Sequence, residues 1–306
     1  MLKFIRHLTN RYIKNNESPF EMEDNVLSSD FECSLASFSF SSHCDDLFLN
    51  RFNHEHIKEF QESSGLSKAL ASKGFPEIEA DIFKDDTGIH HFKLYSSAMK
   101  KSNLLVDLRL SEKSITDISE IAGLTGKGKK MNFLQLEWIS LENPKGSFPE
   151  DHPQLPGQMR PGLGILPQAV QFMRTLISKC GYDGLLIVAD HFHTALIYSS
   201  FSFYADPEIQ GMIQAIQRDL SSFSLNDISW GFITNTIINS NTGEAETFKP
   251  SFQIMPVSKK INDYFNSKKY HKVTEKTYKN KSFSLDTATM NRKRADLLKN
   301  KTISEL

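Results

Sequence analysis

The sequence predicts a mixed α/β fold of the α+β kind, with a mostly antiparallel sheet flanked by helices. Two observations lead to this prediction. Strand patterns joined by hairpin turns dominate the first half of the chain and return near residue 240. Between them lies a strand, a glycine-containing loop, an amphipathic helix and a second strand. Antiparallel strands around one βαβ unit favour a mixed sheet over a doubly wound parallel one.

The composition is that of an ordinary globular protein. The chain has 306 residues, 39% hydrophobic and 24% charged, and a net charge of −1. This balance provides no overall field that would favour nucleic acid or a membrane surface. No apolar run approaches the roughly 20 residues of a membrane span. Three scattered cysteines are too few for a disulfide framework and indicate a reducing compartment, so we expect a cytoplasmic protein.

The chain divides into three parts. Residues 1–50 form a partly irregular extension that begins with a basic helix, residues 51–257 form the main domain, and residues 258–306 form a basic C-terminal tail. Residues 259–306 contain 13 Lys or Arg against five acidic residues, a net charge of +8. We expect this tail to be solvated and partly disordered. Contact with nucleic acid is the less favoured alternative.

The expected elements follow from apolar periodicity and from glycine and proline. Residues 55–73 predict one or two helices that end at Gly74. Asp85–Gly88 is a hairpin turn signal between two strands. Residues 143–161 contain five prolines and predict a loop. The remaining strands are expected at 77–84, 89–95, 104–110, 133–141, 184–189 and 201–204, with helices at 165–179, 191–199 and 208–220. Residues 230–239 and 247–257 predict a closing hairpin around Asn241–Gly243.

Residues 158–164 read Gln-Met-Arg-Pro-Gly-Leu-Gly and lead directly into the helix 165–179. Free backbone N–H groups and the helix dipole make such a helix start an anion site, and glycine permits close approach. The amides of Gly162, Leu163, Gly164 and Ile165 are candidates to hold a phosphate. Arg160 could add a charge-assisted contact. The alternative is a tight turn that only starts a helix.

Two motifs resemble the GNAT family of N-acetyltransferases. Gly162 and Gly164 fill the small positions of that family's pyrophosphate loop, Arg/Gln-x-x-Gly-x-Gly/Ala. The stretch from His191 to Tyr198, followed by Phe203, is similar to its Asn-x-x-Ala-x-x-Leu-Tyr helix and the Gly-Phe beyond it. The resemblance covers roughly residues 75–205. It implies an acyl-CoA N-acyltransferase-like fold with the loop as a cradle for acetyl-CoA or another acyl-CoA.

The resemblance also implies an activity. An amine on a small molecule or a protein would attack the thioester directly and accept the acyl group, most simply acetyl. Tyr198 matches the family's general acid, and its alternative is a residue packed against the sheet. Glu137 could serve as base, directly or through water, if it lies on the strand face opposite Leu136 and Trp138; otherwise it only faces solvent. The second hypothesis is a catalytically inactive interaction or regulatory protein that still binds coenzyme A.

The histidines near residue 190 invite a metal interpretation. Asp190, His191 and His193 could be a fragment of a site, but no further ligand follows at suitable spacing. We therefore expect no metal, with Asp190 as a helix N-cap and His191 in the wall of a substrate cleft. The run Gly126–Lys130 lacks the Ser or Thr of a P-loop and predicts a flexible loop.

Overall fold

The computed structural model describes residues 37–40, 47–115 and 130–306. The expected N-terminal helix and most of the Gly126–Lys130 run lie outside these residues. The strand bounds are β1 Ser37–Phe40, β2 Glu77–Lys84, β3 His90–Ser96, β4 Leu104–Ile115, β5 Met131–Leu141, β6 Gly184–Val188, β7 Phe203–Tyr204, β8 Ile237–Asn239, β9 Phe252–Pro256 and β10 Phe283–Leu285. The helix bounds are α2 His54–Ser63, α3 Leu66–Ser72, α4 Leu166–Cys180, α5 Phe192–Tyr198, α6 Pro207–Asp219, α7 Leu225–Ile233, α8 Lys259–Phe265, α9 Lys268–Asn280 and α10 Thr287–Leu297, with 3-10 turns η1 Lys101–Asn103 and η3 Ile303–Glu305.

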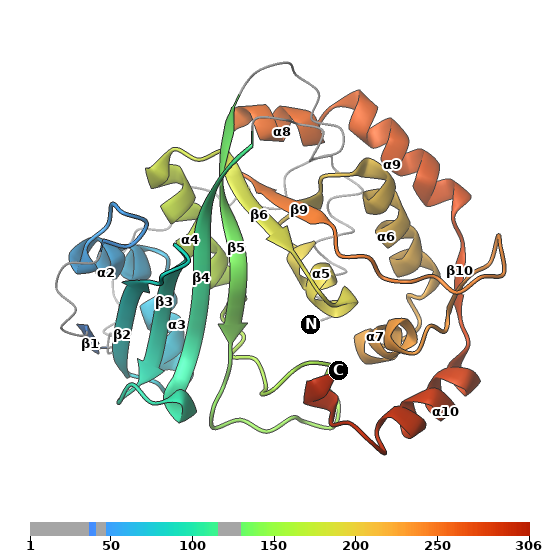
Figure 1. Ribbon diagram of the computed structural model, residues 1–306, viewed down its shortest axis with the longest axis horizontal. Helices are drawn as coiled ribbons and strands as arrows, with labels where there is room; N and C mark the ends of the chain where they lie inside the picture. The colour runs from blue at the N-terminus through green and yellow to red at the C-terminus, as the bar shows by residue number, and fades with distance from the viewer. Residues whose placement is uncertain (1–36, 41–46, 116–129) are drawn as a thin grey trace.

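Eight strands form one sheet in the order β1-β2-β3-β4-β5-β6-β9-β7 (Figure 1). The pairs from β2 to β5 are antiparallel, as are β6 with β9 and β9 with β7. Among the strands of this sheet that the structure describes, only β1 with β2 and β5 with β6 are parallel. Helices flank this mostly antiparallel sheet, so the predicted fold class is confirmed. The arrangement is compatible with an acyl-CoA N-acyltransferase-like fold.

The helix α4 forms where the sequence combines an apolar stripe with suitable ends. Its apolar face is buried, and Phe172 stacks on Phe92 of β3 with ring centroids 4.9 Å apart. Pro167 lies in the first turn, where a missing N–H costs no hydrogen bond. Gly181 ends the helix in the left-handed conformation at φ 70°. None of the helices in the described ranges is long and apolar enough to cross a membrane.

The sheet has a core on each face. The larger core includes Leu136 and Ile187, which are paired across β5 and β6, and it contacts α2, α3, α4 and α5. The smaller core lies on the opposite face and contains Phe133, together with Phe265 of α8 and Tyr270 of α9. The C-terminal helices therefore complete a core of the sheet.

This packing corrects the expectation of a disordered basic tail. Residues 259–306 form α8, α9, β10, α10 and η3. The guanidinium of Arg218 on α6 donates to the carbonyls of Tyr278 and Lys281, and the Tyr270 hydroxyl donates to the carbonyl of Tyr204 at 2.7 Å. Most lysines of the segment are exposed, whereas Phe265, Tyr270 and Phe283 are buried, so the segment is an integral part of the fold.

The predicted closing hairpin is wrong in its first strand. Residues 225–233 form α7, which Ser224 and Asp227 start through a reciprocal capping box. Only Ile237–Asn239 remains a strand, β8, and it pairs with β10 rather than β9. The cap decides the conformation because the apolar run that follows is compatible with either a helix or a strand.

Candidate functional site

The strands β5 and β6 separate beyond Leu136 of β5 and Ile187 of β6. Their parallel pairing covers Phe133–Leu136 with Gly184–Ile187, after which β5 continues to Leu141 and β6 leads toward α5 (Figure 1). Within the described ranges, no strand pairs with the β5 edge from Glu137 to Ser140 that faces β6. Trp138 and Val188 flank this parting and expose large apolar surfaces, 50% and 40%. Unpaired backbone groups and apolar side chains thus meet at one place, which we call the strand split.

The glycine loop is tied to the end of β5, next to the strand split. The Leu163 amide donates to the carbonyl of Leu141 at 2.9 Å, and the Asn143 amide donates to that of Pro161 at 2.8 Å. The Leu163 N–H therefore has a partner and is not free for a phosphate, contrary to the expectation. The Leu163 and Ile165 side chains are buried and anchor the loop, while Gly162 and Gly164 are exposed.

Backbone donors remain open at the start of α4. In the described part of the chain, the N–H groups of Gly164, Ile165, Leu166 and Gln168 donate to no other residue. Gly164 has φ +71°, a conformation that side-chain-bearing residues rarely adopt. Four open donors at the positive end of a 15-residue helix favour an anion.

A lysine lies at this helix start that the sequence did not point to. The Lys73 ammonium lies 3.7 Å from where a Cβ on Gly164 would be. It forms no ion pair within the described residues. Lys73 caps α3, far upstream of the loop, so only the packing of α3 beside α4 brings it there. A cation beside the positive end of a helix is unfavourable unless an anion joins them.

Arg160, the basic residue predicted to contact the phosphate, points toward η1. Its guanidinium donates to the carbonyl of Ser102 in η1 at 3.4 Å. The structure thus places Lys73, and not Arg160, next to the exposed glycine of the loop.

Tyr198 lies at the end of α5 and is 9% exposed. Burial, and then the negative charge of Asp190, raise the pKa of its hydroxyl well above the ordinary value. The group is therefore protonated at neutral pH, as a general acid must be. Its ring packs edge-on against Phe201 at 5.8 Å. The acid role of Tyr198 stays a prediction, with an environment that suits it.

Glu137 lies at a β-bulge. Leu110 of β4 pairs with Leu136 and Arg109 pairs with Trp138, which leaves Glu137 without a partner across the ladder. Its carboxylate accepts a 2.5 Å hydrogen bond from the Ser111 hydroxyl, while Trp138 packs against the Arg109 guanidinium at 5.7 Å. Ser111 and Arg109 share one face of β4. Glu137 and Trp138 therefore lie on the same face, and the expectation that they would be opposed is wrong.

The structure does not bring Glu137 and Tyr198 together. Gln253 faces the larger core, since it pairs with Ile187, and its side-chain amide donates to the carbonyl of Ala195 in α5. The helix that carries Tyr198 thus covers that face. Ser111 and its partner Glu137 lie on the other face. A base at Glu137 would have to act through the strand split, by way of water.

His191 lies where the proline-rich residues 143–161, hereafter the strap, cross α5. A Cβ on Gly157 of the strap would lie only 2.8 Å from the His191 Nε2. Two hydrogen bonds hold the strap in place. The Gly157 amide donates to the carbonyl of Ile303 at 2.8 Å, and the Asn226 side-chain amide donates to the carbonyl of Gln154. The N-cap of α5 is His191 and not Asp190, so the capping role predicted for Asp190 is wrong.

His191 also borders a cavity of about 160 Å³ between α5 and α7. Its ring stacks on that of His193 with centroids 5.3 Å apart. Burial, and then the charge of His191, lower the pKa of His193 to about 4, so this buried imidazole is neutral at pH 7. The described residues contain no group of three or more His, Cys, Asp or Glu that could hold a metal ion.

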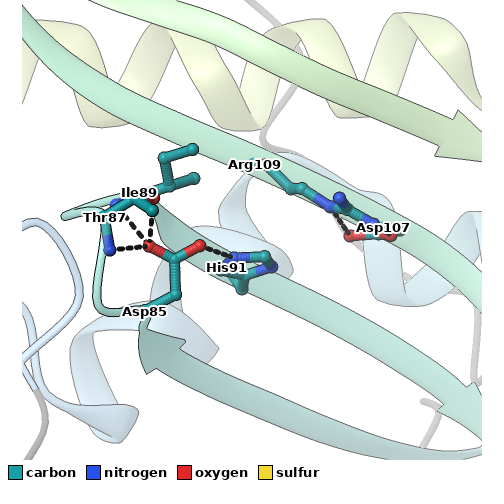
Figure 2. Close-up of polar contacts among 6 residues, drawn as sticks. All are labelled: Asp85, Thr87, Ile89, His91, Asp107 and Arg109. Carbon is teal, nitrogen blue, oxygen red and sulfur yellow. Dashed lines mark hydrogen bonds and ion pairs between the residues drawn. The ribbon is translucent and has the colours of Figure 1, made fainter.

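A second polar cluster lies on β3, β4 and the turn before β3 (Figure 2). Its His91 pairs with Arg109, whose side chain lies on the same face of the sheet as Glu137. The carboxylate of Asp85 accepts from the Thr87 hydroxyl, the Thr87 and Ile89 amides and the His91 imidazole at 2.9 Å. Arg109 donates two hydrogen bonds to the buried Asp107. Asp85 closes the hairpin turn through these bonds, so we assign this cluster a structural role.

A search with models of known protein families gives no match to this sequence, and comparisons with curated proteins and with solved structures give none either.

Proposed function

We propose that this protein is an acyl-CoA-dependent N-acyltransferase, acting on acetyl-CoA or another acyl-CoA in the cytoplasm. The observation that carries the proposal is the strand split with the open helix start beside it. The βαβ unit of β5, α4 and β6 lies between antiparallel parts of the sheet, and its two strands separate where the helix presents its free amides. Elongated phosphate-bearing ligands fit such a place, because the amides hold the phosphates and the parted strands leave backbone groups open.

The residues present fit the phosphates of coenzyme A. The open amides of Gly164, Ile165 and Leu166 would hold the pyrophosphate, with the Lys73 ammonium as counter-charge. Gly164 leaves room for close approach because it has no Cβ. The unpaired edge of β5 would align the remainder of the ligand beside Trp138 and Val188.

An acyl-CoA supplies an activated thioester. The protein then needs to orient the amine, remove its proton and protonate the departing sulfur. Tyr198 is protonated and would donate to the sulfur. The base predicted from the sequence, Glu137, would take the ammonium proton through water because of its position on the other face of the sheet.

Calorimetry with coenzyme A and acetyl-CoA tests the binding site. Lys73→Ala should weaken binding by about tenfold or more, since a hydrogen bond to a charged group contributes about 1.5–3 kcal/mol. Lys68→Ala is the matched control, because Lys68 is an exposed lysine on the same helix α3. Absence of binding to the parent protein at millimolar ligand would refute the proposal, and equal affinities for both variants would refute the role of Lys73.

Turnover on a panel of amines tests the chemistry. Tyr198→Phe should lower kcat by about a hundredfold or more while leaving coenzyme A binding unchanged. The second hypothesis, an inactive binding protein, is favoured by the strap, which lies against His191. Tight binding of coenzyme A without turnover on any amine would support that hypothesis and exclude the enzyme.

A further inference from the structure

The cavity between α5 and α7 combines aromatic walls with polar groups that lack partners. The Phe232 ring stacks on Phe192 at 4.4 Å and meets Phe248 edge-on at 6.1 Å. All three rings border the cavity, together with Asp190, His191 and His193. The cavity is therefore apolar on one side and carries acceptor groups on the other.

The polar groups of this wall are unpaired. His193 is 7% exposed, and no described residue forms a hydrogen bond with its ring nitrogens or with those of His191. The carboxylate of Asp190 has no ion pair or hydrogen bond within the described ranges either. The His193 ring nitrogens are not fully enclosed, so they face the cavity, where a ligand can supply the partner that an imidazole inside a protein normally has.

The size of the cavity limits that ligand. Its volume is about 160 Å³, and a cavity of about 150 Å³ accommodates one benzene molecule. A single aromatic ring with one or two further atoms fills it, and the second ring of a fused pair would extend out of it.

The charge of the wall selects the polar end of the ligand. A carboxylate attracts a cation, and aromatic rings bind ammonium groups over their faces. A neutral imidazole offers a lone pair to an N–H donor. A carboxylate ligand would meet repulsion from Asp190 without a compensating cation among the residues that border the cavity.

We propose that this cavity binds a small primary arylalkyl ammonium of the benzylamine class, and that this amine is the acyl acceptor. The ring lies among the phenylalanines, and the ammonium lies between Asp190 and the two histidines. The acceptor role rests on the proposed acyltransferase function, whereas binding of the amine does not. The same Asp190 carboxylate raises the pKa of Tyr198, so the proposed acid lies within electrostatic range of the ammonium end.

Benzylamine binding to the full chain, measured by calorimetry without coenzyme A, tests the site. Benzylamine should bind at least tenfold more tightly than benzyl alcohol, and 1-naphthylmethylamine should bind more weakly than benzylamine. Asp190→Asn replaces an exposed carboxylate and should remove the preference for the amine. His193→Phe should fill the cavity and abolish binding of both benzyl compounds. His56→Phe is the matched control, at an exposed position of α2, and this variant should bind benzylamine as the parent protein does.

Several results would overturn the proposal. These are absence of benzylamine binding by the parent protein, equal binding by His193→Phe, or equal affinities for the amine and the alcohol. If coenzyme A binds and benzylamine does not, this inference fails and the proposed function stands. If benzylamine binds as described and coenzyme A does not, the site stands and its acceptor role is refuted.

Discussion

Replacing Gly211 by alanine tests whether the basic C-terminal segment is part of the fold. A Cβ on Gly211 of α6 would lie 2.4 Å from the Thr274 carbonyl oxygen and 2.8 Å from the Thr277 Cβ, both on α9. Ordinary contacts of a Cβ begin near 3.4 Å, so α6 and α9 would have to separate by about 1 Å. Overpacking of this kind costs about 1–3 kcal/mol. The higher helix propensity of alanine stabilises the folded state by about 1 kcal/mol and offsets part of this cost.

We therefore expect Gly211→Ala to lower the free energy of unfolding by about 0–2 kcal/mol in urea denaturation. Gln214→Ala, on the same helix, is the control and should change stability by less than about 0.5 kcal/mol. If Gly211→Ala were about 1 kcal/mol more stable than the parent protein, helix propensity alone would explain the change. The packing of α9 on α6 would then be refuted, and residues 259–306 would be the loose tail that their composition suggests.

Three further substitutions give separable effects in urea denaturation. Hydrogen bonds from Thr87 and then His91 hold the pKa of Asp85 well below its ordinary 3.8. The ionised Asp85 stabilises the fold fully above pH 3.8, and this stabilisation is lost as the pH falls below that value. The free energy of unfolding of Asp85→Asn should therefore depend less on pH in that range than that of the parent. Burial lowers the pKa of His193 from 6.5 to about 4, so the parent should lose up to about 3 kcal/mol as pH falls from 6.5 to 4, and His193→Gln should not. Gly181→Ala should cost about 1 kcal/mol from its positive φ alone, because a Cβ there meets no atom within 4 Å; an unchanged stability would contradict the left-handed cap.

The βαβ region could be predicted from the sequence because its apolar patterns extend over many residues and agree with the glycine and proline positions that bound them. The predicted strand 133–141, helix 165–179 and strand 184–189 correspond to β5, α4 and β6 within two residues at each end. The hairpin between β2 and β3 was equally predictable. Asp85 accepts the amides of Thr87 and Ile89, and Gly88 adopts φ +88°, as the turn sequence requires.

The parts that could not be predicted depend on tertiary contacts or on single residues. Lys73 reaches the glycine loop only because α3 packs beside α4. The bulge at Glu137 places two successive side chains on one face of the sheet. No residue type in the strand indicates that a bulge forms there. The sequence offered a signal for α7, the capping box Ser224 and Asp227, but the apolar run after it is compatible with both conformations. The basic segment was misjudged because net charge does not reveal that its aromatic residues complete a core.

The bulge in β5 makes the strand tolerant of the loss of one particular residue. Leu136 pairs with Leu110 and Trp138 pairs with Arg109, so deleting Glu137 would join two pairs that are already in regular register. Trp138 to Leu141 would keep their faces, and the Leu141 carbonyl would still accept the Leu163 amide. A frame-preserving deletion of the Glu137 codon would therefore remove the candidate base and leave the start of α4 in place.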